Sequence, residues 1–90
     1  MSRGDAPALS SELIKRTTGE YDVEMVQWLD LPEQGFRRIE ALAPCVNLLK
    51  LSLAGNKIRT IEGLDTLVRL QRLDLSSNSI QRIGTCFKHH

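Results

Sequence analysis

The side chains that could support catalysis in this 90-residue chain are few and widely spaced. His89 and His90 are its last two residues, where order is least expected. Cys45 and Cys86 are too few for a four-ligand zinc site or a disulfide scaffold. Asp30 and Asp74 could act as an acid–base pair only in a pocket that raises one pKa, and no such pocket is indicated. We therefore expect no catalytic, cofactor or metal site and no small-molecule substrate, and predict that the protein is not an enzyme.

Composition and charge narrow the class further. The chain is 41% hydrophobic, and 12 Lys and Arg nearly balance 11 Asp and Glu for a net charge of +1. This balance favours a folded domain over a disordered chain and argues against a nucleic-acid partner. No apolar run approaches the length of a membrane span, and the first residues lack a secretory h-region. These features predict no membrane partner and an intracellular location, with the cytoplasm as the first choice and the cilium, centrosome and nucleus as open alternatives.

The chain contains an internal repeat of 22 residues. The segment that begins at Leu48 reads Leu-x-x-Leu-x-Leu-x-x-Asn-x-Ile-x-x-Ile, and the same pattern begins again at Leu70. Projected backwards, the apolar positions fall on Val26, Leu29, Leu31, Phe36, Ile39, Leu42 and Cys45. Projected forwards, the position of Leu64 falls on Cys86, so that both cysteines occupy apolar positions of the repeat.

Residues 26–86 resemble leucine-rich repeats of the short 22-residue subclass typified by a regulatory subunit of protein phosphatase 1. The resemblance implies an α/β fold, a short solenoid with parallel strands on the concave face and irregular or 3₁₀ returns on the convex face. It also implies a non-catalytic module or scaffold that binds a partner protein.

The spacing of apolar residues supports this fold independently. Leu51-x-Leu53 and Leu73-x-Leu75 alternate with period two, as strands with one buried face require. Each repeat would form one coil, which consists of a short strand and its return segment. Stacked coils would bury these four leucines, which one coil could not bury alone. Asn56 and Asn78 stand where the chain leaves the strand, and we expect their amides to satisfy backbone groups of their own coil and the next. Gln34 takes this position in the first repeat, which predicts a looser turn there.

The ends of the stack need covers, because a solenoid otherwise exposes its leucines. We expect residues 1–8 to be a flexible tail and residues 9–25 a helical cap, with Ser10 or Ser11 as N-cap and Gly19 at the end of the helix. The cap would lay five apolar side chains on the first coil: Leu9, Leu13, Ile14, Tyr21 and Val23. The repeats then span 26–47, 48–69 and an incomplete 70–86, followed by a tail at 87–90.

The carboxyl-terminal cover is less regular. Either Phe87 folds back as a lid or the chain is a truncated form of a longer solenoid, and we favour truncation. Without a lid, the last coil would expose an apolar edge made of Leu70, Leu73, Leu75, Ile80 and Ile83. Such an edge predicts self-association.

The strand positions that face away from the core are the candidate binding site. They form three columns, which are Trp28, Lys50 and Arg72; Asp30, Ser52 and Asp74; and Pro32, Ala54 and Ser76. The first two columns are the predicted partner-binding residues. Trp28 is either exposed there or packed under the amino-terminal cap.

Two alternative functions stay open. One is a structural fragment of a longer solenoid that has no binding activity of its own. The other is nucleic-acid binding through the cations of the return segments, although Glu40 and Glu62 nearby favour an ordinary solvated surface. These cations are Arg37, Arg38, Lys57, Arg59 and Arg82.

Overall fold

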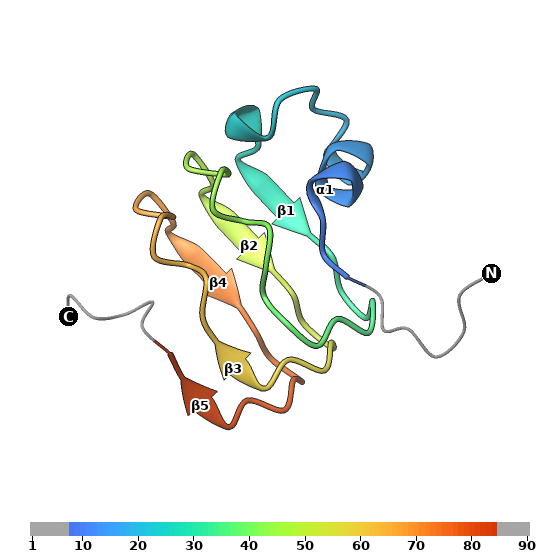
Figure 1. Cartoon of the computed structure of the whole chain (residues 1–90), viewed down its shortest axis with the longest axis vertical. Coiled ribbons are helices and arrows are strands. Elements are labelled where there is room, and N and C mark those ends of the chain that lie inside the picture. The colour runs from blue at the N-terminus through green and yellow to red at the C-terminus, as the bar shows by residue number, and fades with distance from the viewer. Residues whose placement is uncertain (1–7, 85–90) are drawn as a thin grey trace.

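Three short strands pair in parallel at the spacing of the sequence repeat. In the computed structural model, which describes residues 8–84, β1 (Trp28–Asp30), β2 (Lys50–Ser52) and β4 (Arg72–Asp74) form a sheet of order β1-β2-β4 (Figure 1). Trp28 lies opposite Lys50, and Lys50 lies opposite Arg72. Each strand therefore pairs with the strand 22 residues away, and the predicted register is confirmed.

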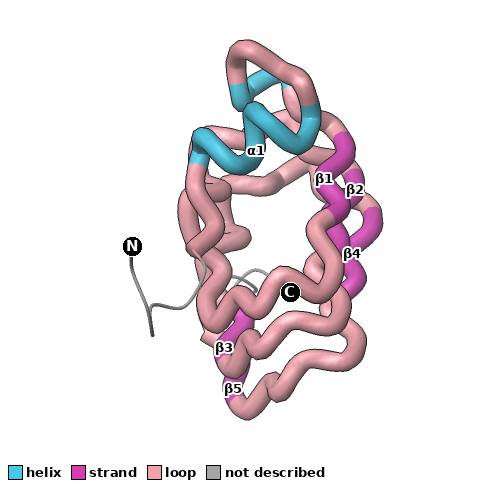
Figure 2. The backbone as a smooth tube through the Cα atoms, turned by 90° about the vertical axis from the view of Figure 1, so that its right-hand side faces the viewer, coloured by secondary structure: helices cyan, strands magenta, loops and turns pink. Residues whose placement is uncertain are grey.

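The return segments run on the opposite side of the molecule and contain a second sheet. Strands β3 (Thr60–Ile61) and β5 (Arg82–Ile83) pair in parallel there (Figure 2). The expectation of wholly irregular or 3₁₀ returns was wrong in this respect, because adjacent returns lie close enough to form ladder hydrogen bonds. Between the sheets the chain makes successive three-residue turns, in which the amides of Cys45 and Leu48 donate to the carbonyls of Leu42 and Cys45. These turns match the period of three in the apolar residues.

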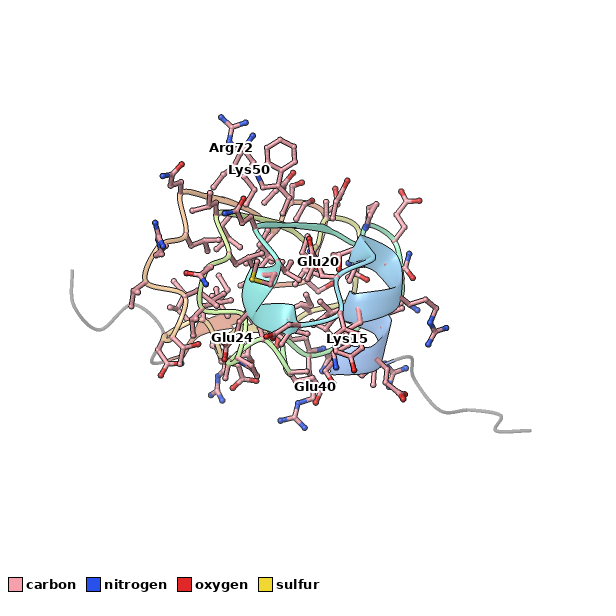
Figure 3. All side chains as sticks on the ribbon, turned by 90° about the horizontal axis from the view of Figure 1, so that it is seen from above. Lys15, Glu20, Glu24, Glu40, Lys50 and Arg72 are labelled. Carbon is pink, nitrogen blue, oxygen red and sulfur yellow. The ribbon has the colours of Figure 1, made fainter. Side chains whose placement is uncertain are left out.

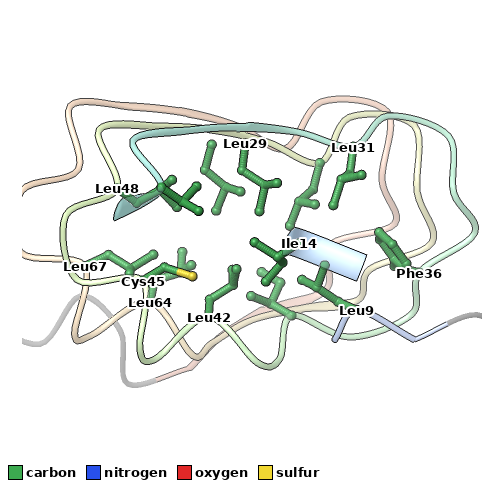
Figure 4. Packing of buried hydrophobic residues seen from close by; sticks show 14 of the residues in the cluster. Leu9, Ile14, Leu29, Leu31, Phe36, Leu42, Cys45, Leu48, Leu64 and Leu67 are labelled. Atoms are coloured by element: carbon green, nitrogen blue, oxygen red, sulfur yellow. The ribbon is translucent and has the colours of Figure 1, made fainter. Parts of the chain in front are cut away.

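The core lies between the two sheets and consists mainly of aliphatic side chains (Figure 4). Leu29 and Leu31 point inwards from the strand side, and Leu42, Cys45 and Leu64 come from the return side. Leu51 and Leu53 are likewise buried. Phe36 is also buried, at 1% exposure. The first two coils thus bury most of the positions that the periodicity indicated.

Helix α1 (Ser11–Thr18) and the 3₁₀-helix η1 (Val23–Met25) lie over the β1 end of the stack (Figures 1 and 2). The side chain of Ser10 accepts a hydrogen bond from the Leu13 amide at 3.2 Å, and Gly19 ends the helix in a left-handed conformation with φ 76°. Leu9, Ile14 and Val23 are buried, and Leu13 packs against the core.

The prediction for Tyr21 was wrong, because this side chain is 94% exposed. Tyr21 lies in the link between α1 and η1, where the left-handed Gly19 turns the chain away from the core. Val23, at the start of η1, is the residue of this segment that reaches the core.

Asn56 joins two coils through its buried amide. Its Oδ1 accepts hydrogen bonds from the backbone amides of Gln34 (2.9 Å) and Phe36 (3.0 Å). Its Nδ2 donates to the carbonyls of Leu31 (3.1 Å) and Leu53 (2.8 Å). Asn56 therefore bonds to its own coil and to the preceding coil. The expectation that its amide bonds to the following coil was wrong.

Asn78 repeats this arrangement one coil later. Its Nδ2 donates to the carbonyls of Leu53 and Leu75, and its Oδ1 accepts from the Ile58 amide. Gln34 does not take part in this way, since its exposed side chain donates only to the carbonyl of Pro32. The first turn also differs in its backbone, because Gly35 has φ 81°, a value without a counterpart at Lys57 or Ser79.

Burial decreases towards the last coil. Leu51 is 1% exposed, whereas Leu73 and Leu75 are only half-buried. The two leucines of the last strand are therefore less buried than the sequence analysis predicted. Ile83 is 64% exposed. The expected exposure of the last coil is therefore present within residues 8–84, and Cys86 and Phe87, which were considered as its cover, lie outside the described residues.

A left-handed backbone conformation recurs within the return segments, at Ala41 and at Gly63 just after β3. It leads to a testable prediction. Ala41 has φ 64°, and Gly63, its counterpart one repeat later, has φ 72°. Because a Cβ destabilises this conformation by about 1–2 kcal/mol, we expect Ala41→Gly to stabilise the fold by about 0.5–1 kcal/mol after the greater freedom of glycine in the unfolded chain is included.

The reverse substitution is the matched control. A Cβ at Gly63 would lie 3.1 Å from the carbonyl oxygen of Ile39, so Gly63→Ala should destabilise the fold. Urea unfolding measures both effects. A destabilising Ala41→Gly would contradict the assignment of strain to this position.

Candidate functional site

The six residues predicted to bind a partner lie together on the outer face of the β1-β2-β4 sheet. This outer face, as we use the term, comprises Trp28, Asp30, Lys50, Ser52, Arg72 and Asp74. They line one open cavity of about 280 Å³, together with Leu29 and Leu51 at its floor. The strand alternation produces this grouping, because residues on either side of each inward leucine must point outwards.

Trp28 is exposed and not covered by the helical cap. Its side chain is 65% exposed, and the Nζ atom of Lys50 lies 4.4 Å from the centre of its ring. This distance is within the range of a cation–π contact, which is worth about 0.5–1 kcal/mol at an exposed site. The contact orients the ring against the neighbouring strand and leaves much of its surface available.

The charges of the outer face are arranged in columns of opposite sign. Lys50 and Arg72 lie next to each other on paired strands, on the side of the molecule away from Glu40 (Figure 3). Asp30 and Asp74 occupy the neighbouring column, separated by Ser52. The Ser76 hydroxyl and amide donate to the carboxylate of Asp74 and lower its pKa.

A second depression adjoins Trp28, and the sequence did not indicate it. It has a volume of about 470 Å³ and lies between the end of α1 and the first strand, where Thr17, Thr18, Glu20 and Met25 line it with Trp28. Met25 is 62% exposed there. Thr17, Thr18, Glu20 and Met25 come from the cap, so the periodicity carried no signal for them, whereas the remaining lining residues belong to the start of the first repeat.

Within residues 8–84, no group of three His, Cys, Asp or Glu side chains could hold a metal ion. No helix in this part of the chain has the length and apolar character needed to cross a membrane. His89 and His90 lie outside the described residues, as does Cys86.

Cys45 is buried, and its thiol should be unreactive in the folded chain. Burial removes the thiolate from water and raises the pKa of Cys45. In a Cys86→Ser background, we expect a thiol reagent to label Cys45 slowly in the native protein and rapidly in urea. A native rate close to the denatured rate would contradict the burial.

The same pKa shift predicts the direction of a pH effect. A thiol whose pKa is higher in the folded chain adds stability below its unfolded pKa, about 8.5. This contribution is lost as the pH rises through the higher folded value. Unfolding measured from neutral to alkaline pH should therefore show a loss of stability that Cys45→Ala lacks.

The cations of the return segments are partly gathered. Arg37, Lys57 and Arg59 line a cavity of about 620 Å³ with Ser79 and Gln81. Arg82 belongs to β5, and neither it nor Arg38 lines this cavity.

Comparison with known families agrees with the repeat. Residues 46–88, just under half of the chain, match the family model described as Leucine Rich repeats (2 copies). Neither the curated proteins nor the solved structures contain a significant match. With the parallel sheets and the confirmed register, the match supports a leucine-rich repeat protein of α/β class. Such repeats are generally protein–protein interaction modules and are typically not enzymes.

Proposed function

We propose that the chain is a non-catalytic interaction module that binds a partner protein through the outer face. The alignment of exposed Trp28 with Lys50 and Arg72 in one column over an open cavity carries this proposal. Tryptophan and arginine contribute disproportionately to binding energy at protein interfaces. In this proposal the sheet is the concave face of a short solenoid.

The chemistry of the outer face indicates what the partner should offer. Trp28 presents an apolar ring, while Lys50 and Arg72 beside Asp30 and Asp74 present both signs of charge in separate columns. A partner segment with an apolar side chain between an acidic and a basic group would complement this pattern. The charges would set orientation, and the ring would supply most of the buried apolar area.

The test is affinity capture with the whole chain, followed by identification of the retained protein and measurement of its affinity in purified form. Trp28→Ala and Arg72→Glu should each weaken binding by at least tenfold. Matched controls are Val68→Ser and Arg38→Glu, which alter exposed side chains outside the outer face. Equal binding by all four variants would refute the proposed face.

A finer placement within the family is also proposed. The 22-residue period supports the subclass typified by a regulatory subunit of protein phosphatase 1, and residues 13–21 resemble the amino-terminal cap of leucine-rich repeat-containing protein 61. On this basis we propose a cap at 9–25, repeats from 26 onwards and an intracellular, cytoplasmic location.

The edge of the last coil supports self-association with a second copy of the chain. Ile83 is 64% exposed on the edge strand β5, and Leu73 and Leu75, on the β4 side of the same last coil, are half-buried. Apolar side chains at an edge strand form a template for pairing. Light scattering at micromolar concentration should give a mass above that of the monomer, and Ile83→Lys should lower it. A monomeric wild-type chain would contradict this proposal.

A further inference from the structure

A basic groove lies beside the β3–β5 sheet, away from the outer face. The basic groove, as defined here, consists of Arg37, Lys57, Arg59, Ser79 and Gln81, one or two residues from each coil. Backbone hydrogen bonds hold these coils together, since the Lys57 amide donates to the Phe36 carbonyl at 2.8 Å and the Gln81 amide donates to the Arg59 carbonyl at 2.7 Å. The backbone positions from which its exposed side chains extend are therefore fixed by the contacts between coils.

The repeat places like charges next to each other in this groove. Arg37 and Arg59 occupy the same repeat position on adjacent coils, with Lys57 in the neighbouring position. Adjacent strands of a stack lie about 4.8 Å apart, and like charges at directly opposite positions destabilise a sheet. Among the described residues, none that lines the groove is acidic.

These cations also lack partners in the part of the chain that the structure describes. The side chains of Arg37, Lys57 and Arg59 make no hydrogen bond or ion pair with any residue from 8 to 84. A cluster of unpaired like charges costs stability that a bound anion would recover. Groups of residues that lower the stability of the fold in this way are expected at binding sites.

The donor set fits a phosphate group. Guanidinium groups donate pairs of parallel hydrogen bonds to phosphate oxygens, and the ammonium group adds a compact positive charge. The Ser79 hydroxyl and the Gln81 amide provide neutral donors at the same groove. A volume of about 620 Å³ exceeds that of the phosphate alone and leaves room for the side chain that carries it.

We infer that the basic groove binds a phosphate monoester carried by a protein segment, such as phosphoserine or phosphothreonine. Nucleic acid is disfavoured because no aromatic side chain among residues 8–84 lines the groove for bases to stack on, and the nearby Phe36 is 1% exposed. Three cations match one dianion better than a long polyanion. The inference concerns a different surface from the proposed partner-binding face and does not depend on it.

The experiment is a nuclear magnetic resonance titration of the isotopically labelled whole chain at physiological salt. The probes are a Gly/Ala peptide with one phosphoserine, its unphosphorylated twin, inorganic phosphate and a short single-stranded RNA. The phosphopeptide should shift the amide signals of Arg37, Lys57, Arg59 and Gln81, whereas the twin should not. Inorganic phosphate should shift the same signals at higher concentration.

Two charge reversals separate the groove from the rest of the surface. Arg59→Glu should weaken phosphopeptide binding at least tenfold, and Arg72→Glu, on the outer face, should leave it unchanged. The spectra also report whether each variant remains folded. Equal binding of both peptides, tighter and steeply salt-dependent binding of the RNA, or no shift in the groove would overturn the inference.

Discussion

Replacement of Asn56 by alanine is expected to lower the free energy of unfolding by about 3–5 kcal/mol. The amide side chain satisfies the Phe36 amide and the carbonyls of Leu31 and Leu53, all of them in buried hydrogen bonds. A buried polar group left without a partner costs about 1–3 kcal/mol. Because Asn56 connects two coils, the substitution removes contacts within its own coil and with the preceding one.

Asn78→Ala is the matched control, since it removes the same chemistry one coil later. Its hydrogen bonds are only partly buried, so water can replace more of them, and the loss should be smaller. Urea unfolding followed by the fluorescence of Trp28 measures both variants. Equal losses, or a change below about 1 kcal/mol for Asn56→Ala, would contradict the role derived from the structure.

Leu51→Ala should destabilise the chain by about 2–5 kcal/mol, the usual range for a buried leucine in a core that cannot collapse around the cavity. Leu51 is 1% exposed and has a neighbouring strand on each side. The total stability of a domain is about 5–15 kcal/mol, so this loss is a large fraction of it.

Leu73→Ala tests whether stacking is the cause. Leu73 occupies the same position of the repeat and pairs with Leu51, yet it is half-buried because β4 is an edge strand. We expect roughly half the loss, measured by thermal and urea unfolding. Identical losses would mean that the flanking coil does not contribute to the burial of Leu51.

The part of the fold that follows from repetition was predictable from the sequence. The offset between Leu29, Leu51 and Leu73 sets the strand register, and the period-two alternation places Trp28, Lys50 and Arg72 on the opposite face. Both inferences need only the geometry of a strand and the need of apolar residues for neighbours. The residues of the outer face were found for the same reason.

Features that depend on direction or on non-repeating segments were not predictable. The amide of Asn56 can bond to either neighbouring coil, and residue type does not say which one. Tyr21 and Trp28 lie at or near the cap, whose path is not constrained by the repeat. The β3–β5 pairing requires two returns to come within hydrogen-bond distance, which a period of three does not indicate.

In the proposed binding mode, the decrease in burial along the stack would couple the binding of a partner at the outer face to local opening. Arg72 belongs to the least buried coil, whereas Trp28 belongs to β1, the strand that α1 packs against. In a stack where each coil contacts only its neighbours, the terminal coil opens at the lowest free energy. A molecule that contacts Trp28 and Arg72 together binds only the closed state, so its apparent affinity is scaled by the closed fraction. By linkage, binding of such a molecule also slows hydrogen exchange in β4. Substitutions in the last coil that do not contact the bound molecule change its affinity by changing the closed fraction.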